Sequence, residues 1–251
     1  MDAKARSPRQ SIHYKLVRRA SGIDAVRLNQ MMKRPNDGGG TTLVLADSDD
    51  LDSVLDSHRD IITASVRDAF RDPAAYFSEL VSEATIPNLR KYLTNFVADG
   101  RWTLLLADTY MMDRATIAAF QWFHPVQYPC MLGTPTADCG DTRFASFYDL
   151  LSIAHWDSIG FAGGIFPCSS HISVDNYGTP STNPTFPADT TTVFGNSSRG
   201  DIMVCNSSGD AGYLSHENGA SYVVGSFSEM LEWIFGELIH NRTPEFDYSR
   251  C

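Results

Sequence analysis

Hydrophobic residues in the first half of the chain recur at three- and four-residue steps, the spacing of one helix face. The first run predicts an amphipathic helix over 51–70. A second helix is predicted to begin at Pro73, because proline suits the first position of a helix. A third is predicted to begin at Pro87 and to end at Gly100, a residue type that often terminates helices. The N-terminal half is therefore expected to be largely helical.

The middle of the chain has a less regular pattern. Trp102–Leu106 is a short apolar run that predicts a buried strand, and Met112–Phe123 has the spacing of a helix. Residues 124–145 contain three prolines and are expected to be rich in loops. The hydrophobic period of Phe147–Trp156 fits either a helix or a strand.

In the last third, short strand-like runs alternate with turn residues. Glycine and asparagine between these runs are typical of hairpin connections. The predicted strands are Thr190–Phe194, Asp201–Cys205, Ala211–His216 and Ser221–Val224. Ser226-Phe227-Ser228-Glu229 then has the pattern of a capping box at the start of an amphipathic helix.

Together these elements predict an α+β fold: N-terminal helices, then an antiparallel strand meander closed by a C-terminal amphipathic helix. Residues 1–40 are expected to be a flexible basic arm, set apart by the glycines at 38–40. They carry nine Lys and Arg against three Asp and Glu, a net charge of +6. Residues 41–251 are expected to form a single domain.

The body of the protein is strongly acidic. Residues 41–251 hold eleven Lys and Arg against twenty-seven Asp and Glu, a net charge of −16. Such a surface is repelled by phosphate backbones, so nucleic acid is an unlikely partner. The acidic charge fits either a basic protein partner or the simple need for solubility.

The last third resembles the SUKH superfamily, whose best-known members are immunity proteins of bacterial toxin systems. The similar stretches are Phe194–Cys205, Gly212–Leu214 and Val223–Leu231. They contain a Gly-Asp at a strand start, a later strand with glycine before an apolar residue, and the Ser-Phe-x-Glu helix start. The resemblance implies a protein that binds and neutralises a cognate toxin without catalysis, with Gly200, Asp201 and Gly212 as markers of the fold.

An acidic immunity protein would suit a toxin with a basic surface, because complementary potentials accelerate association. Residues 110–240 hold thirteen Asp and Glu and three Lys and Arg, so the contact surface is expected there. The candidate toxin-binding residues are Asp138, Asp141, Asp157, Asp175, Asp189 and Glu217.

An enzyme is the alternative, in the form of a thiol- or zinc-dependent hydrolase built on the loop 155–175. Cys168-Ser169-Ser170-His171 has a ligand-like spacing. The other possible zinc ligands are His155, Asp157 and Asp175, and a Cys168 nucleophile could use His155, His171 or His216 as its base. This ligand set is too thin for a closed zinc site, and no catalytic signature surrounds Cys168, so we expect neither a metal nor another cofactor.

The five cysteines are odd in number and widely spaced, which predicts reduced core thiols rather than a disulfide scaffold. The first residues are polar rather than a secretory signal, and no apolar run is long enough to span a membrane. The sequence therefore predicts a cytoplasmic protein without a membrane partner.

Overall fold

The computed structural model describes the C-terminal half of the chain almost continuously and the N-terminal part in shorter segments. The described residues are 14–18, 44–45, 73–99, 102–107, 117–122, 130–133, 139–156 and 163–246, except 180, 182, 198 and 241. Within these ranges no helix is both long enough and apolar enough to cross a membrane.

All described strands belong to one sheet, in the order β12-β11-β10-β9-β7-β6-β5-β4-β3-β1-β2, and β8 also pairs with β9. Neighbouring strands are antiparallel except β1 and β2, which are parallel. The strands are β1 Tyr14–Arg18, β2 Val44–Leu45, β3 Trp102–Ala107, β4 Ile117–Trp122, β5 Cys130–Gly133, β6 Ile153–His155, β7 Gly164–Ile165, β8 Ile172–Ser173, β9 Thr192–Asn196, β10 Ile202–Cys205, β11 Asp210–Leu214 and β12 Ser221–Ser226.

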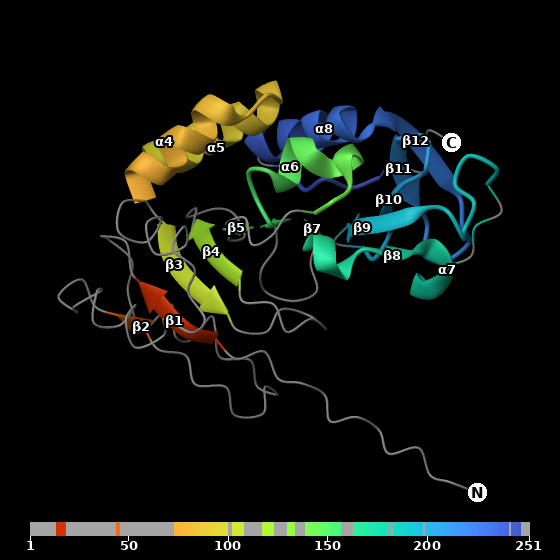
Figure 1. Ribbon diagram of the computed structural model, residues 1–251, viewed down its shortest axis with the longest axis horizontal. Helices are drawn as coiled ribbons and strands as arrows, with labels where there is room; N and C mark the ends of the chain where they lie inside the picture. Colours follow the sequence, from red (N-terminus) through yellow and green to blue (C-terminus); the bar gives the residue numbers. More distant parts are fainter. Residues whose placement is uncertain are drawn as a thin grey trace, which may run out of the picture.

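Helices α4, α5, α6 and α8 lie along one face of the sheet, whereas α7 lies on the opposite side (Figure 1). The helices are α4 Pro73–Glu83, α5 Pro87–Asp99, α6 Ala145–Tyr148, α7 Val174–Tyr177 and α8 Phe227–Ile239, with 3₁₀ turns η1 Thr142–Phe144 and η2 Cys168–Ser170. The predicted α+β class is confirmed, with the antiparallel meander β9–β12 followed by α8.

The meander has apolar side chains on both of its faces. In β10, Met203 and Cys205 belong to the core beneath the helices, whereas Ile202 and Val204 belong to a second core under α7. This division follows the two-residue period of a strand. The second core is completed by Phe166, Val174, Phe186, Val193 and Leu214. Because both faces are covered, β10 is a continuous run of buried residues.

The helices on the first face contact one another through aromatic packing and a pair of hydrogen bonds between α5 and α8. Phe235 of α8 contacts the rings of Tyr92 and Phe147, with centroids 5.3 and 6.5 Å apart respectively. The Asn88 backbone N–H donates to the Glu232 carboxylate at 2.8 Å, and its side-chain amide donates to the Glu232 carbonyl at 2.9 Å. These bonds fix the start of α5 against the middle of α8.

Two sequence expectations differ from the structure. Ile117–Trp122, inside the run expected to be a helix over Met112–Phe123, forms β4 between β3 and β5. Within the segment expected to be a mobile arm, Tyr14–Arg18 forms β1, which pairs with β3. Tyr14, Leu16 and Val17 are residue types that suit a strand, and β1 lies between β3 and β2 in the sheet. The rest of the arm and the helix expected over 51–70 lie outside the described residues.

Strand β12 forms one end of the sheet. Its pairing with β11 shifts register between Ala211 and Gly212, which marks a bulge in this last ladder. Tyr222 and Val223 are 41% and 40% exposed, although the ring of Tyr222 contacts that of Phe246 with centroids 4.9 Å apart. The outer strand of the meander is therefore apolar at its surface.

Candidate functional site

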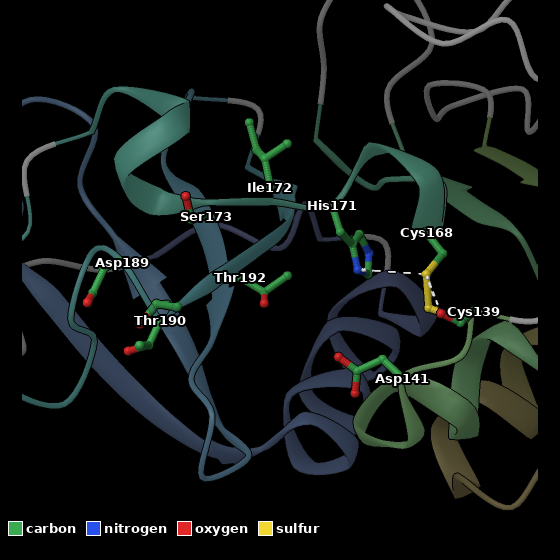
Figure 2. Close-up of a pocket in the computed structure, with 10 residues that line it drawn as sticks. Cys139, Asp141, Cys168, His171, Ile172, Ser173, Asp189, Thr190 and Thr192 are labelled. Atoms are coloured by element: carbon green, nitrogen blue, oxygen red, sulfur yellow. Dashed lines mark hydrogen bonds between the residues drawn. A yellow bond between two sulfur atoms is a disulfide. The ribbon is translucent and has the colours of Figure 1, made fainter.

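A pocket of about 330 Å³ lies beside the start of β9. Its walls come from the segment before η1, from η2 and β8, and from the loop that leads into β9 (Figure 2). The lining residues are Cys139, Asp141, Cys168, His171, Ile172, Ser173, Asp189, Thr190, Thr191 and Thr192. The pocket thus collects two sulfur atoms, one imidazole and two carboxylates from three segments of the chain.

Cys139 and Cys168 form a disulfide, with their Cα atoms 5.6 Å apart. The expectation of ordinary reduced thiols is therefore wrong for this pair. The residues are 29 positions apart in the sequence; Cys139 precedes η1 and Cys168 opens η2. Cys205 is a free cysteine among the described side chains; it is buried in β10, and burial raises the pKa of its thiol to about 11.

The local geometry of η2 places His171 beside the disulfide. Cys168 opens this 3₁₀ turn, and the His171 N–H donates to the Cys168 carbonyl at 3.1 Å. Side chains three residues apart in a 3₁₀ turn lie over one another. The His171 Nδ1 atom is consequently 4.0 Å from the Cys168 Sγ atom (Figure 2).

The other nitrogen of His171 is held by Tyr148. The Tyr148 hydroxyl contacts the His171 Nε2 atom at 2.7 Å and donates its proton to the Phe166 carbonyl at 2.5 Å. A hydroxyl has one proton, so Nε2 must carry the hydrogen of the imidazole and donate it to the Tyr148 oxygen. The lone pair of the neutral ring is then on Nδ1, which faces the sulfur atoms.

Burial keeps this imidazole neutral. The ring packs against Phe144 with centroids 4.8 Å apart and against Tyr148 at 5.2 Å. Desolvation is the main cause that lowers the pKa of His171 from 6.5 to about 4, and the nearby Arg143 acts in the same direction. His171 therefore offers an unprotonated Nδ1 at neutral pH.

Asp141, which lines the pocket, is paired with Arg143. The Asp141 carboxylate accepts the Arg143 backbone N–H at 3.1 Å, which caps η1, and its Oδ2 lies 2.6 Å from Arg143 Nη2. The guanidinium also donates to the Asn206 carbonyl at 2.6 Å and to the Thr192 hydroxyl at 3.3 Å. This hydrogen bonding holds the pKa of Asp141 below its usual value. Arg143 thus ties η1 to β9 and to the turn after β10.

The six candidate toxin-binding residues do not form one surface. Asp141 and Asp189 line the pocket, and Asp175 lies next to them because its N–H donates to the Ala188 carbonyl at 3.0 Å. Glu217 follows β11 at the opposite end of the meander. Asp138 and Asp157 lie outside the described residues.

The residues considered for an enzyme are likewise only partly brought together. Cys168 and His171 meet, but Cys168 is bonded to Cys139 and has no free thiol in this state. His216 is engaged elsewhere, where its Nδ1 lies 3.1 Å from the buried carboxylate of Asp201. His155 lies in β6, paired with Met131 and Gly164.

Three residues of the site escaped the sequence analysis: Cys139, Arg143 and Tyr148. Cys139 had no local signal, because its partners are about 30 residues away. A local signal existed only for the cap at Asp141, since aspartate is a preferred residue at the start of a helical turn; nothing in the sequence pointed to the Arg143 side chain.

Within the described residues, the atoms that could hold a metal ion together are those of Cys139, Cys168 and His171, which all lie within 4.8 Å of one another.

Comparison with known protein families, with curated proteins and with solved structures finds no match for this chain. The site and the fold therefore have to carry the functional argument.

Proposed function

We propose that this protein is a toxin-neutralising binding protein of the SUKH immunity type, which acts by occupying a toxin surface rather than by catalysis. The observation that carries the proposal is the position of the resembling residues. Gly200, Asp201, Gly212 and Ser226 fall in order along one continuous unit, β9–β12 followed by α8. Each one has a structural role in that unit.

Backbone geometry explains the two glycines. Gly200 has a φ of +92° in the turn between β9 and β10, a conformation that residues with a Cβ rarely adopt. At Gly212, a Cβ would lie 2.0 Å from the Tyr222 carbonyl oxygen. Glycine at both positions therefore supports the fold and not a ligand.

Hydrogen bonding explains the other two residues. The buried Asp201 carboxylate contacts His216 at the neighbouring turn. Ser226 and Glu229 form the complete capping box of α8, with the serine side chain accepting from the Glu229 N–H and the glutamate reaching back to the Ser226 N–H. Because the residues that resemble the SUKH superfamily all have structural roles, we expect the toxin to contact other residues.

The acidic rim of the pocket is the surface we assign to the toxin. Asp175 and Asp189 are exposed, and within the described residues neither has a salt bridge. Asp141 lies in the same pocket, but Arg143 already pairs with its charge. Two unpaired carboxylates at one end of the meander create a negative potential that favours a basic partner.

Glu217 belongs to a different part of the surface. Thr192 of β9 pairs with Cys205, and Ile202 pairs with Leu214, so the loop containing Asp189 and the turn containing Glu217 lie at opposite strand ends. A strand of four or five residues separates them by about 15 Å. Glu217 is therefore the matched control for Asp189, since both are exposed acidic residues of the same domain.

The test is coexpression with a toxin domain encoded beside this chain. The wild-type protein should restore growth and form a stoichiometric complex with the toxin. Asp189→Lys should slow association by about tenfold at low salt, with a smaller effect at high salt, whereas Glu217→Lys should change it little. Failure of the wild-type protein to bind or protect would refute the immunity function. Equal effects of the two variants would refute only the pocket rim as the contact surface.

A further inference from the structure

We propose that Cys139, Cys168 and His171 form a Zn²⁺ site when the Cys139–Cys168 disulfide is reduced. The site is independent of the proposed toxin-binding function, since it concerns the sulfur side of the pocket and not its acidic rim. From the sequence alone no zinc site is expected, because Cys168 and His171 have no adequate partner ligands near them in the chain. The structure supplies the missing ligand, Cys139, from a segment 29 residues away.

The distances suit a tetrahedral metal. Zinc binds thiolate sulfur at about 2.3 Å and imidazole nitrogen at about 2.0 Å, which places two sulfurs about 3.8 Å apart and sulfur and nitrogen about 3.5 Å apart. The His171 Nδ1 atom is 4.0 Å from the Cys168 Sγ atom, and all three ligand atoms fit within 4.8 Å. Side-chain rotation of the freed cysteines is enough to reach the metal geometry, because the Cα atoms are 5.6 Å apart.

The hydrogen bonds prepare His171 as a ligand. Tyr148 donates to the Phe166 carbonyl and accepts from Nε2, which leaves the Nδ1 lone pair directed at the sulfur atoms. Histidines that bind metals characteristically donate their second N–H to a fixed acceptor in this way. Tyr148 is thus a positioning residue for the metal ligand.

Charge and ligand type both suit zinc. Two thiolates and one neutral imidazole give a complex with Zn²⁺ of zero net charge, which suits the half-buried position of the three residues. Soft sulfur ligands disfavour magnesium and calcium. The ligands border the pocket, so the fourth position of the metal faces a space that a water molecule can occupy.

The disulfide and the metal exclude each other. A small thiol reductant converts the protein disulfide into two thiols and is itself oxidised to a disulfide. Zn²⁺ then replaces the two thiol protons, which are released to water, as the sulfur–metal bonds form. In the reverse direction, a small-molecule disulfide oxidises the two thiolates to the protein disulfide, takes up two protons to become two thiols, and Zn²⁺ is released. The pocket therefore has an oxidised, metal-free form and a reduced, zinc-bound form.

The experiment measures zinc on the full chain in both redox states. The protein is reduced, freed of reductant without oxygen, exposed to Zn²⁺, desalted and analysed for metal. One Zn²⁺ per chain is expected after reduction and less than about a tenth of that when the disulfide is intact. Absence of zinc from the reduced protein, or equal zinc in both states, would overturn the proposal.

Variants identify the ligands. Cys139→Ser, Cys168→Ser and His171→Gln should each weaken Zn²⁺ binding at least about 100-fold, and Tyr148→Phe should weaken it about 10- to 100-fold. Glutamine can keep the hydrogen bond to Tyr148 while it removes Nδ1. The matched controls are Cys205→Ala and His216→Gln, which should retain full binding. Zinc binding that survives Cys139→Ser or His171→Gln would contradict this ligand set.

A measurement on the unmodified sequence covers the possibility that a variant fails to fold. Zn²⁺ should protect Cys139 and Cys168 of the reduced wild-type protein from alkylation by iodoacetamide, as read by peptide mass spectrometry. Substitution of Co²⁺ should give a thiolate-to-metal charge-transfer band. Equal alkylation with and without Zn²⁺ would refute the site without reference to any variant.

Discussion

The meander β9–β12 with α8 and the pocket beside it are held together in different ways. In the meander, apolar side chains alternate between two cores, and the strands themselves are predicted by short apolar runs between turn residues. The pocket is stabilised by a disulfide, the Asp141–Arg143 salt bridge and the Tyr148–His171 hydrogen bond. The first region depends on a repeated pattern and the second on a few individual bonds. Their sensitivity to mutation, reduction and pH should therefore differ.

The largest effect is expected in the core beneath the helices. Phe235→Ala removes a fully buried ring that contacts Tyr92 and Phe147, and should lower the free energy of unfolding by about 4 kcal/mol. Val223→Ala, at an exposed position, should cost less than about 0.5 kcal/mol. Chemical denaturation of both variants measures the difference, and equal losses would contradict the assigned core.

Reduction of the disulfide should have the next largest effect. Opening a loop of 29 residues lowers the free energy of unfolding by about 3.6 kcal/mol. The loss should be concentrated at the pocket, so amide hydrogen exchange should increase in η1 and η2 more than in β10 and β11. If protection falls equally in both regions, the pocket and the meander are one cooperative unit and the contrast between them is wrong.

Acid should affect the pocket through His171. The unfolded imidazole takes up a proton near pH 6.5, but the folded one does so only near its lowered pKa of about 4. The free energy of unfolding should therefore decrease as the pH falls from about 6.5 to about 4, by about 2 kcal/mol after allowance for partial exposure. In the disulfide form with a chelator present, His171→Gln should remove this part of the pH dependence. If the free energy of unfolding of the variant depends on pH as steeply as that of the wild type, other groups cause the dependence.

The smallest effect is expected at the helix cap. Ser226→Ala removes the acceptor for the Glu229 N–H and should lower the free energy of unfolding by about 1 kcal/mol. Ser226→Asp, which retains an acceptor, should restore most of it. Thermal denaturation compares the two variants. A loss much larger than this would mean that Ser226 also stabilises the β12 edge.

Local patterns were sufficient for the regular elements and failed where the partners are distant. The alternation in β9–β12, the capping box of α8 and the proline starts of α4 and α5 are all visible within a few residues, and all are confirmed. The strand β4 was expected to be a helix, because Ile117-Ala118-Ala119-Phe120 fits a helical period as well. Its pairing with β3 and β5 decides the outcome.

The candidate site shows the same limit. The Cys168-x-x-His171 spacing was visible in the sequence, since both residues belong to one turn. The partnership with Cys139 and the contact with Tyr148 depend on how η1, α6 and η2 meet in the folded chain. Sequence spacing cannot predict such contacts. Only Cys168 and His171 are recognisable as neighbouring ligands from the sequence, and two ligands are too few for a metal site.

The register shift at Ala211 and Gly212 has a consequence for the behaviour of the protein at high concentration. Strand β12 has the sequence Ser-Tyr-Val-Val-Gly-Ser, without a charge or a proline. Outer strands usually avoid recruiting another chain by carrying lysine or proline, or by being bent. Since β12 has neither residue, its bulge is the feature of this strand that disfavours pairing with another chain. Resistance to self-association at this edge therefore depends on backbone geometry. A mutation that removed the bulge should promote pairing of β12 with another chain, even if it added no apolar surface.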